Sequence, residues 1–207
     1  MRTFITLVLL LTLSVTLFPQ AKQKTTEVDK KVQAFIDRNK NEWTSGHFSE
    51  TDGKIIYDMI VKNKYTRAVE IGTGTGHSSI WLAWALSKTG GKLITIEINE
   101  DRYKEALARF KEAGLSDYID ARRADAFELL PALKGMYDFV LMDAIISTKF
   151  FDTMAPKLVV GARYITHGIE EQDSTSSYVK HLKSYTNFET ILKTDGGFCT
   201  SIKKSEK

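Results

Sequence analysis

The sequence predicts a doubly wound α/β fold, in which helices cover both faces of a mostly parallel β-sheet. From residue 67 onwards, short apolar segments alternate with helical segments over five consecutive units, which is the pattern of a parallel sheet. A tight turn, Gly72-x-Gly74-x-Gly76, follows the first apolar segment. Two closing β-type segments flank Gly196-Gly197 and predict an antiparallel C-terminal hairpin.

The length and composition are those of one globular domain. The chain has 207 residues, of which 43% are hydrophobic and 27% are charged, a balance that excludes a disordered protein. A formal net charge of +3 is too small to indicate a nucleic-acid partner. The single cysteine, Cys199, excludes an intrachain disulfide and a thiolate metal cluster, and we expect it to be a small core residue.

The N-terminal segment, residues 1–21, is expected to be a targeting element. An apolar run from Phe4 to Phe18 follows Arg2 and precedes Pro19-Gln20-Ala21, as in a secretory signal cleaved after Ala21. The run is short for a bilayer span. Lysines that follow it favour a second interpretation, an uncleaved anchor that keeps the domain in the cytoplasm. A misplaced start codon is a third. We expect an exported protein, with membrane contact only through this segment.

Residues 22–50 are expected to form an N-terminal helix and a cofactor-access loop before the main domain, residues 51–207. The helix is predicted from Thr26 to Lys40, because its apolar residues recur at helical spacing. The loop from Asn41 to Thr51 is interpreted either as a lid or as a plain connector. Ser49 or Thr51 is expected to cap a helix from Asp52 to Lys62.

The alternating units follow in order. Strands are expected at Arg67–Ile71, Lys92–Ile98, Tyr118–Arg123, Tyr137–Met142 and Ala162–Thr166, and helices at Ser78–Ser87, Glu100–Glu112, Ala126–Leu133, Ser147–Leu158 and Ser174–Tyr185. Phe188–Lys193 and Phe198–Ile202 are expected to form the hairpin, with an antiparallel strand at one edge of the sheet.

Acidic residues follow four successive strands. Glu70 and the glycine turn end the first strand and Glu97 ends the second, whereas Asp125 and Asp143 follow the third and fourth. The carboxyl ends of parallel strands share one edge of the sheet, and ligands bind there where the strand order reverses. An acid at the end of the second strand accepts hydrogen bonds from ribose hydroxyls. The pattern therefore predicts a nucleoside site.

Two cofactor classes use such an edge. Dinucleotide sites have Gly-x-Gly-x-x-Gly, whereas this turn has glycines at alternate positions, and Glu70 beside it would repel a pyrophosphate. A cationic ligand with an ammonium and a sulfonium suits the acid better. A dehydrogenase is therefore the least favoured interpretation.

At these residues the chain resembles the class I S-adenosylmethionine-dependent methyltransferases, and more narrowly the catechol and caffeoyl-CoA O-methyltransferase family. The resemblance runs from about Thr51 to Lys204. The motifs that carry it are Val69-Glu70-Ile71-Gly72-Thr73-Gly74-Thr75-Gly76-His77-Ser78, Leu93-Ile94-Thr95-Ile96-Glu97, Ala124-Asp125-Ala126 before Leu130-Pro131, Tyr137-Asp138-Phe139-Val140-Leu141-Met142-Asp143-Ala144, and Asp195-Gly196-Gly197.

The resemblance implies a seven-stranded Rossmann-like sheet and assigns roles to individual residues. Glu70, Gly72 and Ser78 would line the methionine part of S-adenosylmethionine, with Gly74 and Gly76 completing the turn. Glu97 would hold the ribose. Asp125, Ala126 and Phe127 would flank the adenine. Phe48 would contact the cofactor through its backbone, and Asp143 would lie beside the sulfonium.

The acceptor half of the site, where the family binds its metal and the methyl acceptor, differs from the family's pattern. Ile145 and Ile146 stand where the family has a second polar residue and a catalytic lysine, and Lys149 is the nearest candidate replacement. His167 and Gly168 stand where the family has two metal ligands. Asp143 with His167 would make a poor Mg²⁺ site, although such a pair suits a transition metal. We therefore expect no divalent metal.

The sequence thus predicts a methyltransferase that transfers a methyl group from S-adenosylmethionine to a small-molecule acceptor, with an O-methyltransferase favoured. The alternative from another class is a non-catalytic relative that binds a nucleoside ligand or a partner protein. This alternative is motivated by the altered acceptor half and by the export signal. A homodimer is left open.

Overall fold

The computed structural model describes residues 26–40, 48–169, 171–193 and 197–206. The expected signal or anchor segment lies outside these residues, as do most of the access loop and the turn at residues 194–196. Within the described ranges, no helix is long and apolar enough to cross a membrane.

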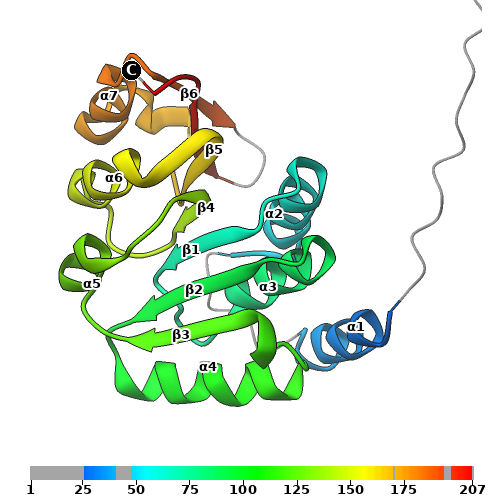
Figure 1. Ribbon diagram of the computed structural model, residues 1–207. Helices are drawn as coiled ribbons and strands as arrows, with labels where there is room; N and C mark the ends of the chain where they lie inside the picture. The colour runs from blue at the N-terminus through cyan, green and yellow to red at the C-terminus, as the bar shows by residue number, and fades with distance from the viewer. Residues whose placement is uncertain (1–25, 41–47, 170, 194–196, 207) are drawn as a thin grey trace, which may run out of the picture.

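Seven strands form one sheet (Figure 1). They are β1 (Arg67–Ile71), β2 (Lys92–Glu97), β3 (Ile119–Arg123), β4 (Tyr137–Met142), β5 (Leu158–His167), β6 (Phe188–Lys193) and β7 (Phe198–Lys203), in the order β3-β2-β1-β4-β5-β7-β6. Strands β1 to β5 pair in parallel, and β7 is antiparallel to both β5 and β6. The predicted mostly parallel α/β fold with a C-terminal hairpin is confirmed.

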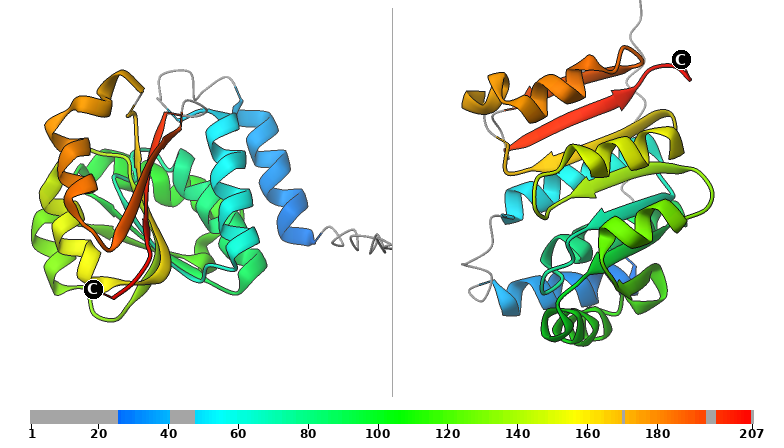
Figure 2. Two further views of the ribbon diagram at one scale, coloured as in Figure 1. Left: turned by 90° about the horizontal axis from the view of Figure 1, so that it is seen from above. Right: turned by 90° about the vertical axis from the view of Figure 1, so that its left-hand side faces the viewer.

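Helices form a layer on each face of the sheet (Figure 2). One layer holds α1 (Glu27–Asn39), α2 (Glu50–Asn63), α3 (His77–Thr89) and α4 (Glu100–Glu112), and the other holds α5 (Ala126–Ala132), α6 (Thr148–Met154) and α7 (Ser177–Ser184). Side chains alternate along a strand, so that Ala68 packs under the first layer and Val69 under the second.

The strand order reverses at β1. The chain runs outward from β1 through β2 to β3, and then returns to place β4 on the other side of β1. The glycine turn that follows β1 therefore lies at the switch point, as the sequence predicts, and open α/β sheets bind their ligands at such points.

Three boundaries differ from the prediction by more than two residues. The expected helix Ser147–Leu158 stops at Met154 and is followed by a 3₁₀ turn, Ala155–Lys157, because Pro156 has no N–H to continue the helical bonds. Strand β5 begins at Leu158 rather than Ala162, and its pairing with β4 shifts register between Tyr137 and Phe139. The last helix, α7, begins at Ser177, after a 3₁₀ turn at Glu171–Thr175.

The expected place of the antiparallel strand is also wrong. Strand β7 lies between β5 and β6 instead of at the edge, so the edge strand β6 runs parallel to β5. The burial of β7 explains this order, since Phe198 and Cys199 are buried on opposite faces of the sheet and each joins the core of its own face.

Helix α1 shares the core of the main sheet. Val32, Phe35 and Ile36 are buried in the same apolar cluster as α2 and α3. Asp29 accepts a hydrogen bond from Trp84 Nε1 at 2.6 Å and pairs with Lys88, both from α3. The N-terminal helix is thus packed against the sheet's first helical layer, and the division of the chain at residue 51 stays a prediction.

Candidate functional site: a cavity at the carboxyl edge of the sheet

The turn between β1 and α3 is held against both neighbouring strands. Gly72 N and Thr73 N donate to Ile96 O of β2 at 3.0 and 3.1 Å, and Asp143 N donates to Ile71 O at 2.9 Å. Gly72 has a φ of +97°, and a Cβ there would lie 2.4 Å from the carbonyl oxygen of Asp143. Only glycine fits this approach, which explains the first glycine of the motif.

Glu97, at the end of β2, is tied to the turn. Its Oε2 accepts a hydrogen bond from Gly74 N at 2.8 Å, and its Oε1 accepts one from Asn99 N at 2.9 Å. The residue is 5% exposed. Each carboxylate oxygen has a second lone pair, so the carboxylate has a fixed orientation and keeps acceptor capacity for hydroxyl groups.

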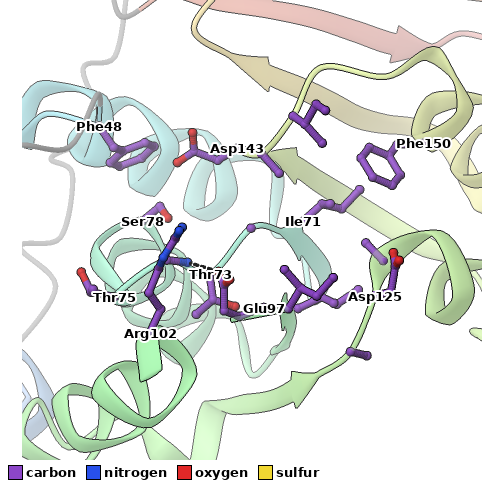
Figure 3. Close-up of a pocket in the computed structure, with 18 of the residues that line it drawn as sticks. Phe48, Ile71, Thr73, Thr75, Ser78, Glu97, Arg102, Asp125, Asp143 and Phe150 are labelled. Carbon is purple, nitrogen blue, oxygen red and sulfur yellow. Dashed lines mark hydrogen bonds between the residues drawn. The ribbon is translucent and has the colours of Figure 1, made fainter. Parts of the chain in front are cut away.

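These elements enclose a cavity of about 450 Å³ (Figure 3), a volume typical of sites for small organic ligands. Nine of the predicted site residues line it: Phe48, Gly72, Gly74, Ser78, Glu97, Asp125, Ala126, Phe127 and Asp143. Phe48 and Asp143 lie at one end and Asp125 at the other, with Glu97 between them (Figure 3). The cavity thus runs along the ends of the strands, with an acidic residue at each end and a third between them.

The adenine end expected from the sequence contains a pair of aromatic rings. Phe127 stacks on Phe150 of α6, with ring centroids 4.3 Å apart and an interplanar angle of 23°. Asp125 caps α5 by accepting a hydrogen bond from Phe127 N at 2.7 Å. Asp125, Phe127 and Phe150 all line the cavity.

Glu70 lies beneath the turn and is not among the residues that line the cavity. It is fully buried, and its Oε2 accepts hydrogen bonds from Thr95 Oγ1, at 2.6 Å, and from Ser79 Oγ. Burial raises its pKa to about 7, against the opposing effect of these hydroxyls. In this geometry Glu70 braces the start of α3 against β2, and its predicted contact with the cofactor stays a prediction.

Asp143 and His167 meet, as their places at the ends of β4 and β5 predict. His167 Nδ1 and Asp143 Oδ1 are 3.0 Å apart, and His167 Nε2 lies 3.7 Å from Asp52 Oδ2 at the start of α2. Burial acts to lower the pKa of His167, but hydrogen bonds and charges from the two aspartates outweigh it and raise that pKa. The ring is thus held between two carboxylates.

This donor set does not fit a Mg²⁺ site. Mg²⁺ prefers several oxygen ligands in octahedral geometry, whereas Asp143 Oδ1 is hydrogen-bonded to an imidazole. His167 therefore already uses one of the two carboxylate oxygens. Within the described ranges, no group of three His, Cys, Asp or Glu side chains is arranged to hold a metal ion.

Lys149 lies over the ring of Phe127. Its Nζ is 5.3 Å from the centroid of the Phe127 ring, and the residue is not among those that line the cavity. A cation over an aromatic face is a stable placement. The structure thus brings Lys149 to the Phe127 end rather than to Asp143, and Gly76 lies outside the lining as the N-cap of α3.

Residues 69–169 match the model of a protein family described as a methyltransferase domain. The match covers the glycine turn, the ends of β2 and β4, and the last residues of β5, so it includes the whole carboxyl edge of the parallel strands.

Curated relatives resemble the same part of the chain. Caffeoyl-CoA O-methyltransferase 1 of Eucalyptus globulus is 30% identical over 110 residues, which cover 51% of this chain and 44% of that protein. Catechol O-methyltransferase of Niastella koreensis is 32% identical over 100 residues, covering 46% of this chain and 45% of that protein. The chain thus spans less than half the length of these relatives.

A solved structure extends the likeness over most of the fold. The O-methyltransferase from Bacillus cereus, solved in complex with SAH, superimposes with a TM-score of 0.70, covering 85% of this chain and 91% of that chain. The two sequences are 22% identical, so the likeness supports the fold alone.

Several residues that line or adjoin the cavity were not predicted from sequence. Arg102 of α4 lines the cavity, as does His77, whose pKa burial lowers to about 4. Asp52 contacts His167 from α2. The sequence Ser49-x-x-Asp52 is typical of a capping box, and both of its hydrogen bonds are present. This pattern predicts the start of a helix, but it does not predict that Asp52 contacts His167.

Proposed function

We propose that this chain binds S-adenosylmethionine in the cavity and transfers its methyl group to a hydroxyl of a small-molecule acceptor. The observation that carries the proposal is Glu97, whose carboxylate is oriented by Gly74 N and Asn99 N inside a cavity that also contains Asp143. In such a cavity Glu97 can accept hydrogen bonds from ribose hydroxyls, and the negative charge of Asp143 can stabilise a positively charged sulfur. The match of residues 69–169 to a methyltransferase domain supports the same assignment.

The side chains that line the cavity suit the three parts of S-adenosylmethionine. Glu97 would accept hydrogen bonds from the ribose, Ala126 and Phe150 would cover the adenine, and Asp143 would oppose the sulfonium charge. When bound, S-adenosylmethionine supplies a methyl group: its C–S bond breaks as a C–O bond forms, S-adenosylhomocysteine remains, and the hydroxyl proton is released.

The protein's own contribution would be positioning and exclusion of water. Phe48 is 4% exposed, and its ring packs edge-on against His167 and His77 at one end of the cavity. Asp143 is anchored through its backbone to β1. These contacts hold the ends of β1, β4 and β5 together around the position proposed for the reacting sulfur.

The proposal includes catalysis without a divalent metal. It is supported by the direct contact between Asp143 and His167, and by Gly168, which offers no side-chain ligand at the next position.

The test is to measure S-adenosylhomocysteine formation by the purified chain with a panel of phenols, catechols and acidic hydroxyl compounds, with and without a chelator. We expect turnover with at least one acceptor and less than a twofold change on chelation. Cofactor binding without turnover of any acceptor would favour the non-catalytic alternative, and a strict Mg²⁺ requirement would contradict the metal-independent mechanism.

We also propose export through residues 1–21, with a membrane anchor as the alternative. The support is the sequence alone: a basic start, a short apolar run and a small residue at the cleavage position. Intact mass of the protein isolated from its native host tests this, since loss of about 21 residues is expected for a cleaved signal, and an uncleaved N-terminus in the membrane fraction would contradict it.

A further inference from the structure

We propose that His167 is a positioning residue that holds the Asp143 carboxylate in the orientation that favours a cationic sulfur ligand over a neutral one. The inference rests on the proposed function, because it concerns how the same cavity distinguishes S-adenosylmethionine from its demethylated product.

The first observation is the contact itself. His167 Nδ1 and Asp143 Oδ1 are 3.0 Å apart, and a carboxylate can only accept, so Nδ1 carries the hydrogen. The Asp143 side chain is 25% exposed and lines the cavity, whereas the His167 side chain is 4% exposed and does not. The histidine therefore acts on a ligand only through Asp143.

The second observation is that the imidazole is fixed on several sides. The rings of Phe48 and His167 form a T-shaped pair with centroids 5.2 Å apart, and the ring centroid of Phe198 on β7 lies 5.3 Å from that of His167. Asp52 Oδ2 lies 3.7 Å from Nε2. A buried ring between two phenylalanines and a second carboxylate has little freedom to rotate, so the bond at Nδ1 has a defined direction.

The third observation is that the backbone of Asp143 is also fixed. Its N–H donates to Ile71 O at 2.9 Å, and its carbonyl lies so close to Gly72 that no Cβ fits between them. With the backbone anchored, the remaining freedom of this residue is rotation of its side chain, and the histidine bond restrains that rotation. The sequence separates the two residues by a complete strand and helix, but β4 and β5 bring them together.

The consequence is a charge-specific effect on binding. S-adenosylmethionine and S-adenosylhomocysteine share the nucleoside and the amino-acid part but differ by the methyl group and the positive charge on sulfur. A carboxylate held beside the sulfur stabilises only the charged ligand. Loss of the restraint should therefore weaken binding of S-adenosylmethionine more than binding of S-adenosylhomocysteine.

Two substitutions at His167 separate its two nitrogens. The amide nitrogen of asparagine can occupy the position of Nδ1, whereas that of glutamine reaches the position of Nε2. His167→Asn should keep the bond to Asp143, and His167→Gln should lose it while keeping a polar group near Asp52. Asp52→Asn is the matched control, because it changes the partner of Nε2 and leaves the Nδ1 bond in place.

The experiment is calorimetric titration of the full chain and the three variants with each ligand, alongside thermal unfolding. We expect the ratio of the S-adenosylhomocysteine Kd to the S-adenosylmethionine Kd to fall about tenfold in His167→Gln. The same ratio should change less than about threefold in His167→Asn and Asp52→Asn. Equal weakening of both ligands in His167→Gln would show a merely structural role and overturn the proposal.

A second variant keeps the test decisive if His167→Gln does not fold. Asp143→Asn removes the charge that His167 is proposed to orient, and it should lower the same Kd ratio about tenfold or more. An unchanged ratio in Asp143→Asn would overturn the proposal. Absence of binding of both ligands by the wild-type chain would instead refute the proposed function.

Discussion

At the scale of single residues, two glycines of the same turn have different reasons to be glycine. Gly72 has no room for a side chain, because a Cβ would lie 2.4 Å from the Asp143 carbonyl oxygen. Gly74 has a φ of +54° and lines the cavity, and a Cβ at this position would have no atom within 4 Å. The first requirement comes from the fold, and the second from the space that a ligand needs.

Gly72→Ala and Gly74→Ala should therefore separate stability from binding. Gly72→Ala forces the turn and β4 apart, so we expect a loss of more than about 2 kcal/mol in the free energy of unfolding. Gly74→Ala should cost about 1 kcal/mol, the strain of a left-handed alanine, but should weaken cofactor binding because the methyl group enters the cavity. Urea unfolding and calorimetry measure the two effects, and equal stability losses in the two variants would contradict this interpretation.

The buried carboxyl of Glu70 makes stability depend on pH. Burial raises its pKa from 4.5 to about 7, so between these values the folded chain holds a proton that the unfolded chain has released. Stability must then fall as the pH rises through this window.

We expect the wild-type chain to lose about 3 kcal/mol between pH 4.5 and pH 7.5 from this group. Glu70→Gln, which keeps an acceptor for Ser79 and Thr95 but does not titrate, should lack that component. Urea unfolding of both proteins across this range measures the difference. The prediction fails if the stability difference between wild type and Glu70→Gln is the same at both ends.

At the scale of elements, helix α1 depends on one aspartate. Asp29 accepts from Thr26 N and Thr26 Oγ1 in the capping box, from Trp84 Nε1 of α3, and pairs with Lys88, whose side chain is 7% exposed. Burial acts to raise the pKa of Asp29, but these partners outweigh it and hold that pKa well below its ordinary value. The carboxylate is therefore the main polar link between α1 and α3.

Asp29→Ala should lower the free energy of unfolding by about 2–3 kcal/mol, because it removes a cap and leaves Lys88 and Trp84 without this acceptor. Asp37→Ala on the same helix is the control. Asp37 is exposed and accepts a hydrogen bond from the exposed Gln33 side chain one turn away, so its loss should change stability by less than about 0.5 kcal/mol. Similar effects of the two changes in urea unfolding would contradict the link.

Elements are predictable from sequence where one signal dominates. The apolar runs of β1 and β4 and the charged amphipathic face of α4 predict these elements to the residue, because strand and helix periodicities there are uninterrupted. The start of β5 is missed, because Val159-Val160-Gly161 lies beyond a register shift that no local pattern reveals. The order of β6 and β7 is missed because strand order depends on which faces the two strands bury.

At the scale of the whole molecule, the topology assembles the cofactor half of the cavity from residues that each follow a strand directly. Gly72, Glu97, Asp125 and Asp143 are therefore predictable from sequence. Glu70 lies beneath the turn instead of on the cavity lining, and its predicted contact with the cofactor stays a prediction. The contact between Asp52 and His167 joins α2 to β5, and only the folded sheet brings these distant segments together.

The most direct test of the central claim is calorimetric titration of the full chain with S-adenosylmethionine. We expect one bound cofactor per chain and at least about tenfold weaker binding in Glu97→Ala. Glu100→Ala, which changes an exposed acid three residues away that does not line the cavity, should bind like the wild type. No binding by the wild-type chain at millimolar cofactor, or equal affinities in Glu97→Ala and wild type, would contradict it.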